Sequence, residues 1–282
     1  MGTIKTKDGT ELYYKEWGAG RPVILIHGWP LSADSWDFQA MAIAEAGFRV
    51  IAYDRRGFGR SSQPWSGYEY DTLADDLASV IEQTVARDAT IVGFSMGGGE
   101  VARYMSRHGA KDVVQAVLVS SVVPFMLKTA DNPTGVDQSV FDGMTEAITQ
   151  DRAKFFSGFF KDFYSGDSSS STVSQEVLEW SRSVAVQAGL KATLECTNAF
   201  ATTDFRPDLP AFSVPTLIIH GTADKTVPID ASSRVAAKMI INSHLIEYDG
   251  APHGLTATHG IQLSKDLIDF LNRHSLVEAL KH

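Results

Sequence analysis

The stretch Ile91-Val92-Gly93-Phe94-Ser95-Met96-Gly97-Gly98-Gly99-Glu100 decides how the rest of this chain is interpreted. An apolar run from Ala89 to Val92 is typical of a buried strand, and residues 100–108 indicate a helix. Between them, Gly93-x-Ser95-x-Gly97 is the pattern of a nucleophile elbow, a sharp strand-to-helix turn that exposes a serine hydroxyl. Glycine is needed there because larger side chains two residues from the serine would collide with strand and helix. The pattern is short, so a glycine-rich turn with an idle serine stays open as the alternative.

The composition indicates a chain with a large core and an acidic balance. Of its 282 residues, 44% are hydrophobic and 21% are charged, and the formal net charge is −9. No run of basic residues interrupts this balance, so neither nucleic acid nor a membrane surface is expected as a partner. The single cysteine, Cys196, excludes an intrachain disulfide and a multi-cysteine zinc site. Without a long apolar segment, the expected location is cytoplasmic.

Strand and helix patterns alternate along the chain, which predicts an α/β fold with a mostly parallel sheet and helices on both faces. An antiparallel hairpin is expected first, with strands at 3–6 and 11–17 around the turn dipeptide Asp8-Gly9. Further strands are expected at 22–27, 48–53, 89–92, 114–119, 214–220 and 244–248. Helices are expected at 36–46, 71–86, 100–108, 231–239 and 260–271.

The alternation is interrupted between two of these strands. From about residue 124 to 208 the sequence indicates helices rich in aromatic residues, broken by a serine-rich surface loop at 165–171. An insertion of this kind suits a helical lid better than a separate domain. We therefore expect a core formed by residues 1–123 and 211–282, with a lid at 124–210.

Polar residues that follow three of the strands predict a catalytic triad. Ser95 follows the elbow strand, Asp224 follows the strand at 214–220, and His253 follows the strand at 244–248. The carboxyl ends of parallel strands meet at one edge of a sheet, and the order serine, acid, histidine is the one that the elbow motif predicts. His253 would take the serine proton, and an ionised Asp224 would fix the tautomer of His253.

Each of these assignments has an alternative. Asp224 could instead cap a helix, and His253 could be an ordinary turn residue. Asp249 is a rival acid, although its place in the same loop as His253 favours a role in the turn. Two residues of the elbow helix, Glu100 and Arg103, are expected on the surface, solvated or ion-paired.

An oxyanion hole requires two backbone donors aimed at the developing negative charge. The N–H of Met96, at the start of the elbow helix, would be one of them. The second is expected from Trp29, in the His27-Gly28-Trp29-Pro30 turn that follows the strand at 22–27. Pro30 restricts Trp29 to extended conformations. A simple strand-terminating turn is the alternative interpretation.

The chain resembles the α/β-hydrolase superfamily, and more closely its cofactor-free haloperoxidase, perhydrolase and aryl esterase branch. The resemblance extends over nearly the whole chain, and its motifs are His27-Gly28-Trp29-Pro30, residues 54–61, residues 93–101, residues 203–207 and Ala251-Pro252-His253-Gly254. It implies an α/β-hydrolase fold with an eight-stranded sheet and a helical lid. It also implies the Ser95–His253–Asp224 triad, with oxyanion donors at Trp29 and Met96 and no metal or organic cofactor.

The resemblance further implies an acyl pocket lined by aromatic and apolar side chains. The candidates are Trp29, Pro30, Phe94, Phe125, Phe159, Phe163, Phe200 and Val227. The expected substrate is a small aryl or alkyl ester, cleaved through an acyl-enzyme that water or hydrogen peroxide then attacks. In this branch a proline after the oxyanion-loop tryptophan, here Pro30, is associated with perhydrolase activity. Relatives often assemble, so a homo-oligomer stays open.

Several other functions are weighed against this one. A lactonase or γ-lactamase would use the same residues. Epoxide hydrolases and haloalkane dehalogenases share the His-Gly-x-Pro turn but use an aspartate where this chain has Ser95. A dinucleotide-binding fold is disfavoured because Gly57-x-Gly59 lacks the third glycine. A non-catalytic small-molecule binding protein on the same fold remains, although no residue of the expected site is damaged.

Overall fold

The computed structural model describes residues 2–166 and 173–279, and its strands form one sheet in the order β1-β2-β4-β3-β5-β6-β7-β8. The first two pairings, β1 with β2 and β2 with β4, are antiparallel, and all the others are parallel. The strands are β1 (Gly2–Lys5), β2 (Glu11–Trp17), β3 (Pro22–Ile26), β4 (Arg49–Tyr53), β5 (Ala89–Phe94), β6 (Val113–Val119), β7 (Thr216–Gly221) and β8 (Ser243–Tyr248). The predicted hairpin and mostly parallel eight-stranded sheet are therefore confirmed.

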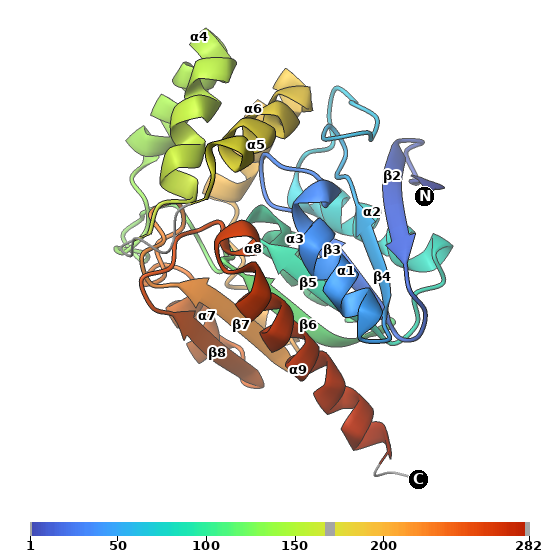
Figure 1. Cartoon of the computed structure of the whole chain (residues 1–282). Helices are drawn as coiled ribbons and strands as arrows, with labels where there is room; N and C mark the ends of the chain where they lie inside the picture. The colour runs from blue at the N-terminus through green and yellow to red at the C-terminus, as the bar shows by residue number, and fades with distance from the viewer. Residues whose placement is uncertain (1, 167–172, 280–282) are drawn as a thin grey trace.

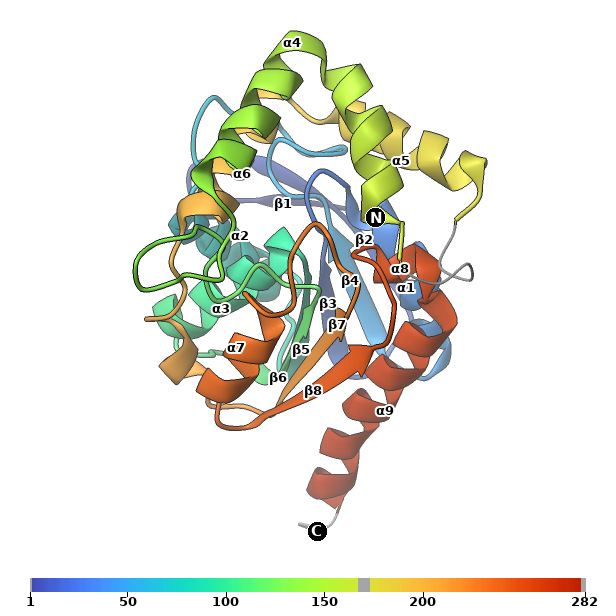
Figure 2. The ribbon, with the colours of Figure 1, turned by 90° about the vertical axis from the view of Figure 1, so that its left-hand side faces the viewer.

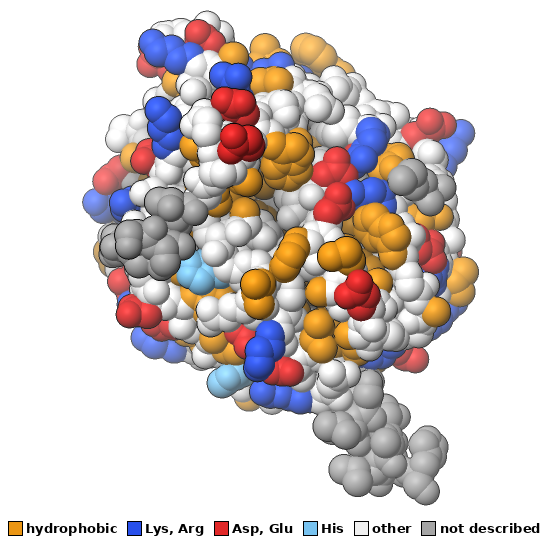
Figure 3. Space-filling view, in the orientation of Figure 1, with side chains coloured by type: hydrophobic (Ala, Val, Ile, Leu, Met, Phe, Trp, Pro, Cys, Tyr) orange, Lys and Arg blue, Asp and Glu red, His pale blue; other side chains and the backbone are white. Residues whose placement is uncertain are grey.

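The central strands are apolar along their whole length because helices cover both faces of the sheet. All residues of β3 and β5 are buried. On one face lie α2 (Tyr70–Gln83), α3 (Met96–Arg107) and α7 (Ser233–Met239), and on the other α1 (Asp37–Glu45), α8 (Leu255–Thr258) and α9 (Gly260–Ala279), as Figure 2 shows. No helix of the described residues is long and apolar enough to cross a membrane. On the face shown in Figure 3, acidic and basic side chains are interspersed.

The parallel register brings the ends of the central strands together. Ile26 pairs with Gly93, and Phe94 pairs with Val119. The loops that follow β3, β5 and β6 therefore start side by side at the carboxyl edge of the sheet. The loops after β7 and β8 emerge at the same edge and are joined by a hydrogen bond from Ala223 N–H to Ala251 O at 3.0 Å.

Between β6 and β7, the described part of the chain contains three α-helices that cover this edge and are called the lid below (Figure 1). They are α4 (Gln138–Phe163), α5 (Gln175–Gln187) and α6 (Leu190–Thr202). The long helix α4 is kinked at Asp151, and its inward face carries buried aromatic residues such as Phe156, Phe160 and Phe163. The serine-rich loop predicted at 165–171 lies largely outside the described residues.

The elbow helix α3 starts before its helical sequence pattern and is more deeply buried than predicted. It begins at Met96, the residue expected at its start as an oxyanion donor, whereas the pattern indicates a helix at 100–108. The side chain of Glu100 is fully buried, whereas the sequence analysis expected it on the surface. Its charge is neutralised by the equally buried guanidinium of Arg55, which follows β4, and Tyr53 donates a hydrogen bond to it at 2.6 Å. Arg103, by contrast, is ion-paired as expected, with Asp71 and Asp208.

We expect the Glu100→Ala variant to unfold far more readily than the wild type. Removing one partner of a buried ion pair leaves the other charge unpaired, which costs about 3–5 kcal/mol. Urea unfolding would measure this as a lower midpoint at an unchanged slope. Asp269→Asn, which removes the partner of the exposed Lys265 in α9, is the control and should leave the midpoint in place. Equal midpoints for the two variants would contradict the assignment.

Candidate active site

Ser95 occupies the turn between β5 and α3 in a conformation that L-residues rarely adopt, with φ 54° and ψ −118°. The turn is anchored by a hydrogen bond from Ser95 N–H to Val119 O at 2.8 Å. A Cβ atom at Gly93 would lie 2.4 Å from the carbonyl oxygen of Gly97, and one at Gly97 would lie 2.7 Å from the carbonyl oxygen of Ile26. These separations are far below van der Waals contact, so the elbow requires glycine at both positions.

His253 lies within hydrogen-bonding distance of both other residues predicted as a triad. His253 Nε2 is 2.9 Å from Ser95 Oγ, and His253 Nδ1 is 2.6 Å from Asp224 Oδ2. A carboxylate oxygen accepts only, so Nδ1 carries the proton and Nε2 is free to accept the serine hydroxyl proton. The imidazole and the carboxylate are fully buried. This geometry provides a serine with a base already in the tautomer needed to activate it.

The carboxylate of Asp224 is buried without an arginine or lysine partner among the described residues. Its Oδ1 accepts hydrogen bonds from the N–H groups of Thr226 at 2.9 Å and Val227 at 2.8 Å, while Oδ2 faces His253 and His220. Burial by itself would raise the pKa of Asp224, but attraction to His253 and hydrogen bonds from both histidines hold this pKa well below its usual range. Asp224 is therefore ionised when the histidine needs it.

Asp249, the rival acid, does not contact His253. It is exposed, and it accepts a hydrogen bond from Thr222 Oγ1 at 3.3 Å. Asp249 is the first residue after β8, at the start of the loop that carries His253.

Two phenylalanines enclose the imidazole of His253. The ring centroid of Phe94 is 5.3 Å from that of the imidazole, and the ring of Phe163 approaches edge-on at 4.7 Å. The end of α4 is also tied to this loop, because Gly254 N–H donates to the carbonyl oxygen of Phe163 at 2.9 Å. These contacts keep water from the sides of the ring and fix its plane.

The two residues predicted as oxyanion donors belong to segments next to Ser95. Met96 is the first residue of α3, and Trp29 follows Gly28, where a Cβ atom would lie 3.0 Å from the Cβ of Ser95. Neither N–H donates a hydrogen bond to another group of the residues the structure describes. The indole of Trp29 is held in place by a hydrogen bond from Nε1 to Thr193 O in the lid at 3.1 Å. Both N–H groups are therefore still able to donate to a bound anion.

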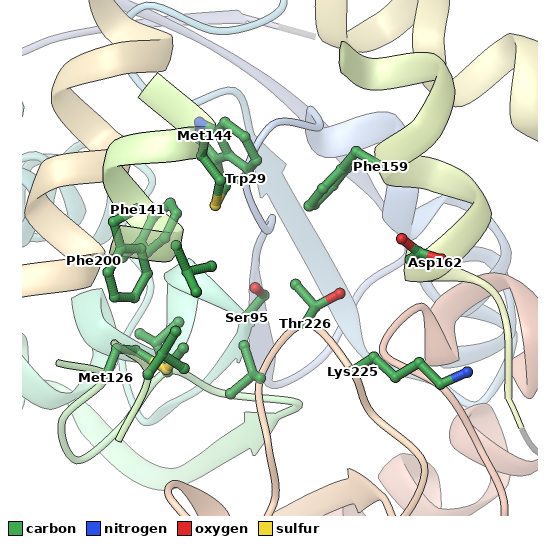
Figure 4. A pocket seen from close by; sticks show the side chains of 14 residues that line it. Trp29, Ser95, Met126, Phe141, Met144, Phe159, Asp162, Phe200, Lys225 and Thr226 are labelled. Carbon is green, nitrogen blue, oxygen red and sulfur yellow. The ribbon is translucent and has the colours of Figure 1, made fainter. Parts of the chain in front are cut away.

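A cavity of about 260 Å³ opens above Ser95, between the core and the lid (Figure 4). Its walls are mainly apolar, and the residues lining it are Trp29, Ser95, Val122, Met126, Val136, Val140, Phe141, Met144, Phe159, Asp162, Phe200, Lys225, Thr226 and Val227. The close-up shows Phe141, Met144 and Phe159 of the lid above the serine, with Thr226 beside Ser95 and Lys225 farther out.

Half of the predicted pocket residues line this cavity, namely Trp29, Phe159, Phe200 and Val227. The other four lie elsewhere. Phe94 and Phe163 pack on His253, Phe125 lies beneath the Arg206 guanidinium at 5.1 Å, and Pro30 is buried behind Trp29.

The sequence analysis missed several residues of the cavity wall. Among them are Met126, Phe141 and Met144. Helical periodicity in the lid shows that an apolar face exists, and Phe141 and Phe156 are both buried residues of α4. It does not show whether that face meets the core or an open cavity, so no signal in the sequence identifies these residues.

The chain is similar to known proteins over nearly its whole length. A model of the α/β hydrolase fold matches residues 21–259. The chain is 42% identical to a non-heme chloroperoxidase of Kitasatospora aureofaciens, over 97% of this chain and 100% of the relative. It is also 42% identical to a bifunctional esterase/perhydrolase of Acinetobacter calcoaceticus, over 96% and 99% of the two chains. Among solved structures, a bromoperoxidase from Bacillus anthracis superposes with a TM-score of 0.93 at 44% identity, covering 96% of this chain and 99% of its own.

The contacts of the two acids predict that only substitution of Asp224 will lower the reactivity of Ser95. Asp224→Asn would present an amide to His253 and favour the wrong tautomer, so we expect labelling of Ser95 by a fluorophosphonate probe to slow roughly 10³- to 10⁴-fold. Asp249→Asn should be labelled at the wild-type rate. Mass spectrometry of the Ser95 peptide over time measures both rates, and slow labelling of Asp249→Asn would contradict the assignment.

Proposed function

The chain belongs to the α/β hydrolase fold family, and we propose that it is a serine hydrolase that cleaves small carboxylic esters through an acyl-enzyme. The observation that carries the proposal is the unbroken chain of contacts from Ser95 Oγ through His253 to Asp224, at 2.9 and 2.6 Å, beneath a mainly apolar cavity. Two relatives, the esterase/perhydrolase and the non-heme chloroperoxidase, support the same class of chemistry.

The mechanism follows from the donors and acceptors around Ser95. His253 Nε2 accepts the hydroxyl proton as Ser95 Oγ bonds to the ester carbonyl carbon, and the N–H groups of Trp29 and Met96 stabilise the resulting oxyanion. The C–O bond to the alcohol then breaks, and the leaving oxygen takes the proton from His253. Water attacks the acyl-enzyme with His253 again as base, which releases the acid and restores Ser95. Each oxyanion donor is expected to contribute about 10²–10³ in rate.

The size and lining of the cavity favour a small, apolar substrate. A volume of about 260 Å³ lies just below the range of roughly 300–1,000 Å³ that is usual for ligand pockets. Apart from Ser95 and Thr226, the polar residues of the wall are Asp162 and Lys225, both exposed and both at one side. We propose that the acyl group is short and uncharged, and that an aryl or alkyl leaving group extends toward the opening.

Hydrolysis of p-nitrophenyl acetate and butyrate by the wild type and by Ser95→Ala tests the proposal. Removal of the nucleophile should lower kcat about 10⁴- to 10⁶-fold, because the serine and the histidine act as a unit. Release of p-nitrophenolate measures the rate, and trapping of the acylated Ser95 peptide after rapid acid quench identifies the intermediate.

Two outcomes would overturn the proposal. A wild type that is no faster than Ser95→Ala would indicate a binding protein on this fold. A wild type that hydrolyses a γ-lactone or a γ-lactam far faster than either ester would indicate a lactonase or lactamase that uses the same triad.

A second activity, perhydrolysis, is favoured by the residue after Trp29. Pro30 occupies that position, and the relative from Acinetobacter calcoaceticus is a bifunctional esterase/perhydrolase. We propose that hydrogen peroxide can replace water in the second half of the reaction and release a peracid. In this proposal Pro30 directs the carbonyl group of Trp29 so that it accepts a hydrogen bond from the attacking peroxide.

We expect Pro30→Leu to lower the ratio of peracid formation to ester hydrolysis, since leucine does not impose the same restriction on Trp29. Oxidation of a halide or dye by the peracid, measured beside p-nitrophenyl acetate hydrolysis in one preparation, gives the ratio. Phe125→Leu, an aromatic substitution beyond the cavity wall, serves as the control. An unchanged ratio of peracid formation to ester hydrolysis in Pro30→Leu would contradict this part of the proposal.

A further inference from the structure

A second buried histidine contacts the acid of the proposed triad. His220, the last residue but one of β7, has no exposed surface. Its Nε2 lies 3.0 Å from Asp224 Oδ2 and 2.9 Å from the carbonyl oxygen of Val227. Its Nδ1 lies 2.7 Å from the hydroxyl oxygen of Ser233, which begins α7. Both nitrogens of this imidazole are therefore engaged.

These partners determine which nitrogen carries the proton. Nε2 faces a carboxylate oxygen and a carbonyl oxygen, and both of these groups accept only. Nε2 is therefore protonated. Its N–H is aligned for a hydrogen bond to the carbonyl oxygen of Val227, and Asp224 Oδ2 lies 3.0 Å from the same nitrogen. Nδ1 then accepts a hydrogen bond from the hydroxyl of Ser233, which is itself buried. The hydroxyl of Ser233 thus holds His220 in the tautomer that serves Asp224.

The carboxylate of Asp224 depends on N–H groups because no lysine or arginine of the described residues pairs with it. Oδ1 accepts from the backbone N–H groups of Thr226 and Val227. Oδ2 accepts from His253 and lies 3.0 Å from the protonated nitrogen of His220. Buried polar groups without partners are costly, and a buried charge is the costliest of them. His220 supplies the donor on the same oxygen that His253 uses, so it bears directly on the orientation of that oxygen.

We propose that His220 is a positioning residue, which holds Asp224 Oδ2 toward His253. The proposed triad then becomes part of a longer series of side-chain contacts that runs from Ser233 through His220, Asp224 and His253 to Ser95. The inference rests on the proposed function, because it assigns a role within that site. His220 does not line the cavity, so it contacts no substrate. Its loss should lower kcat while leaving KM within about twofold, since only the chemical steps use Asp224.

Two amide substitutions separate the donor from the bulk of the side chain. In His220→Gln the amide nitrogen can reach the place of Nε2 and donate to Asp224. In His220→Asn the shorter amide reaches only the place of Nδ1, so the contact with Ser233 survives and the contact with Asp224 is lost. We expect kcat for p-nitrophenyl acetate to fall about 10- to 100-fold in His220→Asn, the effect of losing one hydrogen bond to a charged group. His220→Gln should stay within about threefold of the wild type.

A third variant and a control separate positioning from general stability. Ser233→Ala removes the partner of Nδ1, and we expect a fall in kcat smaller than that of His220→Asn. Gln115→Leu also removes buried hydrogen bonds. Gln115 lies near the amino end of the neighbouring strand β6, away from the carboxyl edge that carries the site. This substitution should lower the midpoint of urea unfolding without lowering kcat. If kcat follows the unfolding midpoint across all four variants, His220 is only structural and the proposal fails.

A proton resonance provides a readout that does not depend on turnover. The His253 Nδ1 proton, in its 2.6 Å hydrogen bond to Asp224, should appear at low field in the NMR spectrum and be absent in His253→Ala. We expect it at the wild-type position in His220→Gln and shifted or lost in His220→Asn. An unmoved resonance together with an unchanged kcat in His220→Asn would overturn the inference. A wild type that shows the resonance but no Ser95-dependent hydrolysis would instead overturn the proposed function.

Discussion

The backbone at Ser95 is the constraint on which the rest of the site depends. A non-glycine residue at φ 54° costs roughly 1–3 kcal/mol, and the surrounding packing must hold it there. Two glycines allow β5, α3 and the end of β3 to approach within distances that no Cβ would permit. The same close approach brings the loop after β3 beside the serine. One tight turn therefore presents the hydroxyl and starts the helix whose first N–H has no hydrogen-bond partner among the described residues.

Two buried carboxylates illustrate different uses of a charge. Glu100 is paired with Arg55, so its charge is cancelled permanently and the pair joins α3 to the residues that follow β4. Among the residues that the structure describes, Asp224 has no lysine or arginine partner, and its carboxylate faces two backbone N–H groups and two histidine nitrogens. Its negative charge therefore stays available to stabilise His253 when that ring becomes positive during the proposed reaction. An arginine paired with the carboxylate of Asp224 would cancel this charge. This gives a physical reason why a second histidine, and not an arginine, lies beside Asp224.

The lid is bound to the site from two sides. The end of α4 meets the histidine loop through Gly254 and Phe163, and α6 accepts a hydrogen bond from the indole of Trp29. The floor of the cavity belongs to the core, and much of its wall belongs to α4 and α6. Changes in the packing of the lid would therefore alter the volume of the cavity, the enclosure of His253 and the position of the oxyanion loop together.

The sequence by itself determined the fold class, the strand-end positions of Ser95, Asp224 and His253, and the glycine spacing of the elbow, because these depend on local pattern and chain order. Only the tertiary structure decided which acid meets His253, that Glu100 is buried against Arg55, that His220 faces Asp224, and which aromatic residues line the cavity. Phe94 and Phe163 pack on the imidazole, whereas Phe141 faces the cavity. Such contacts join side chains far apart in the chain, and their directions depend on how helices and loops pack, which no local periodicity encodes.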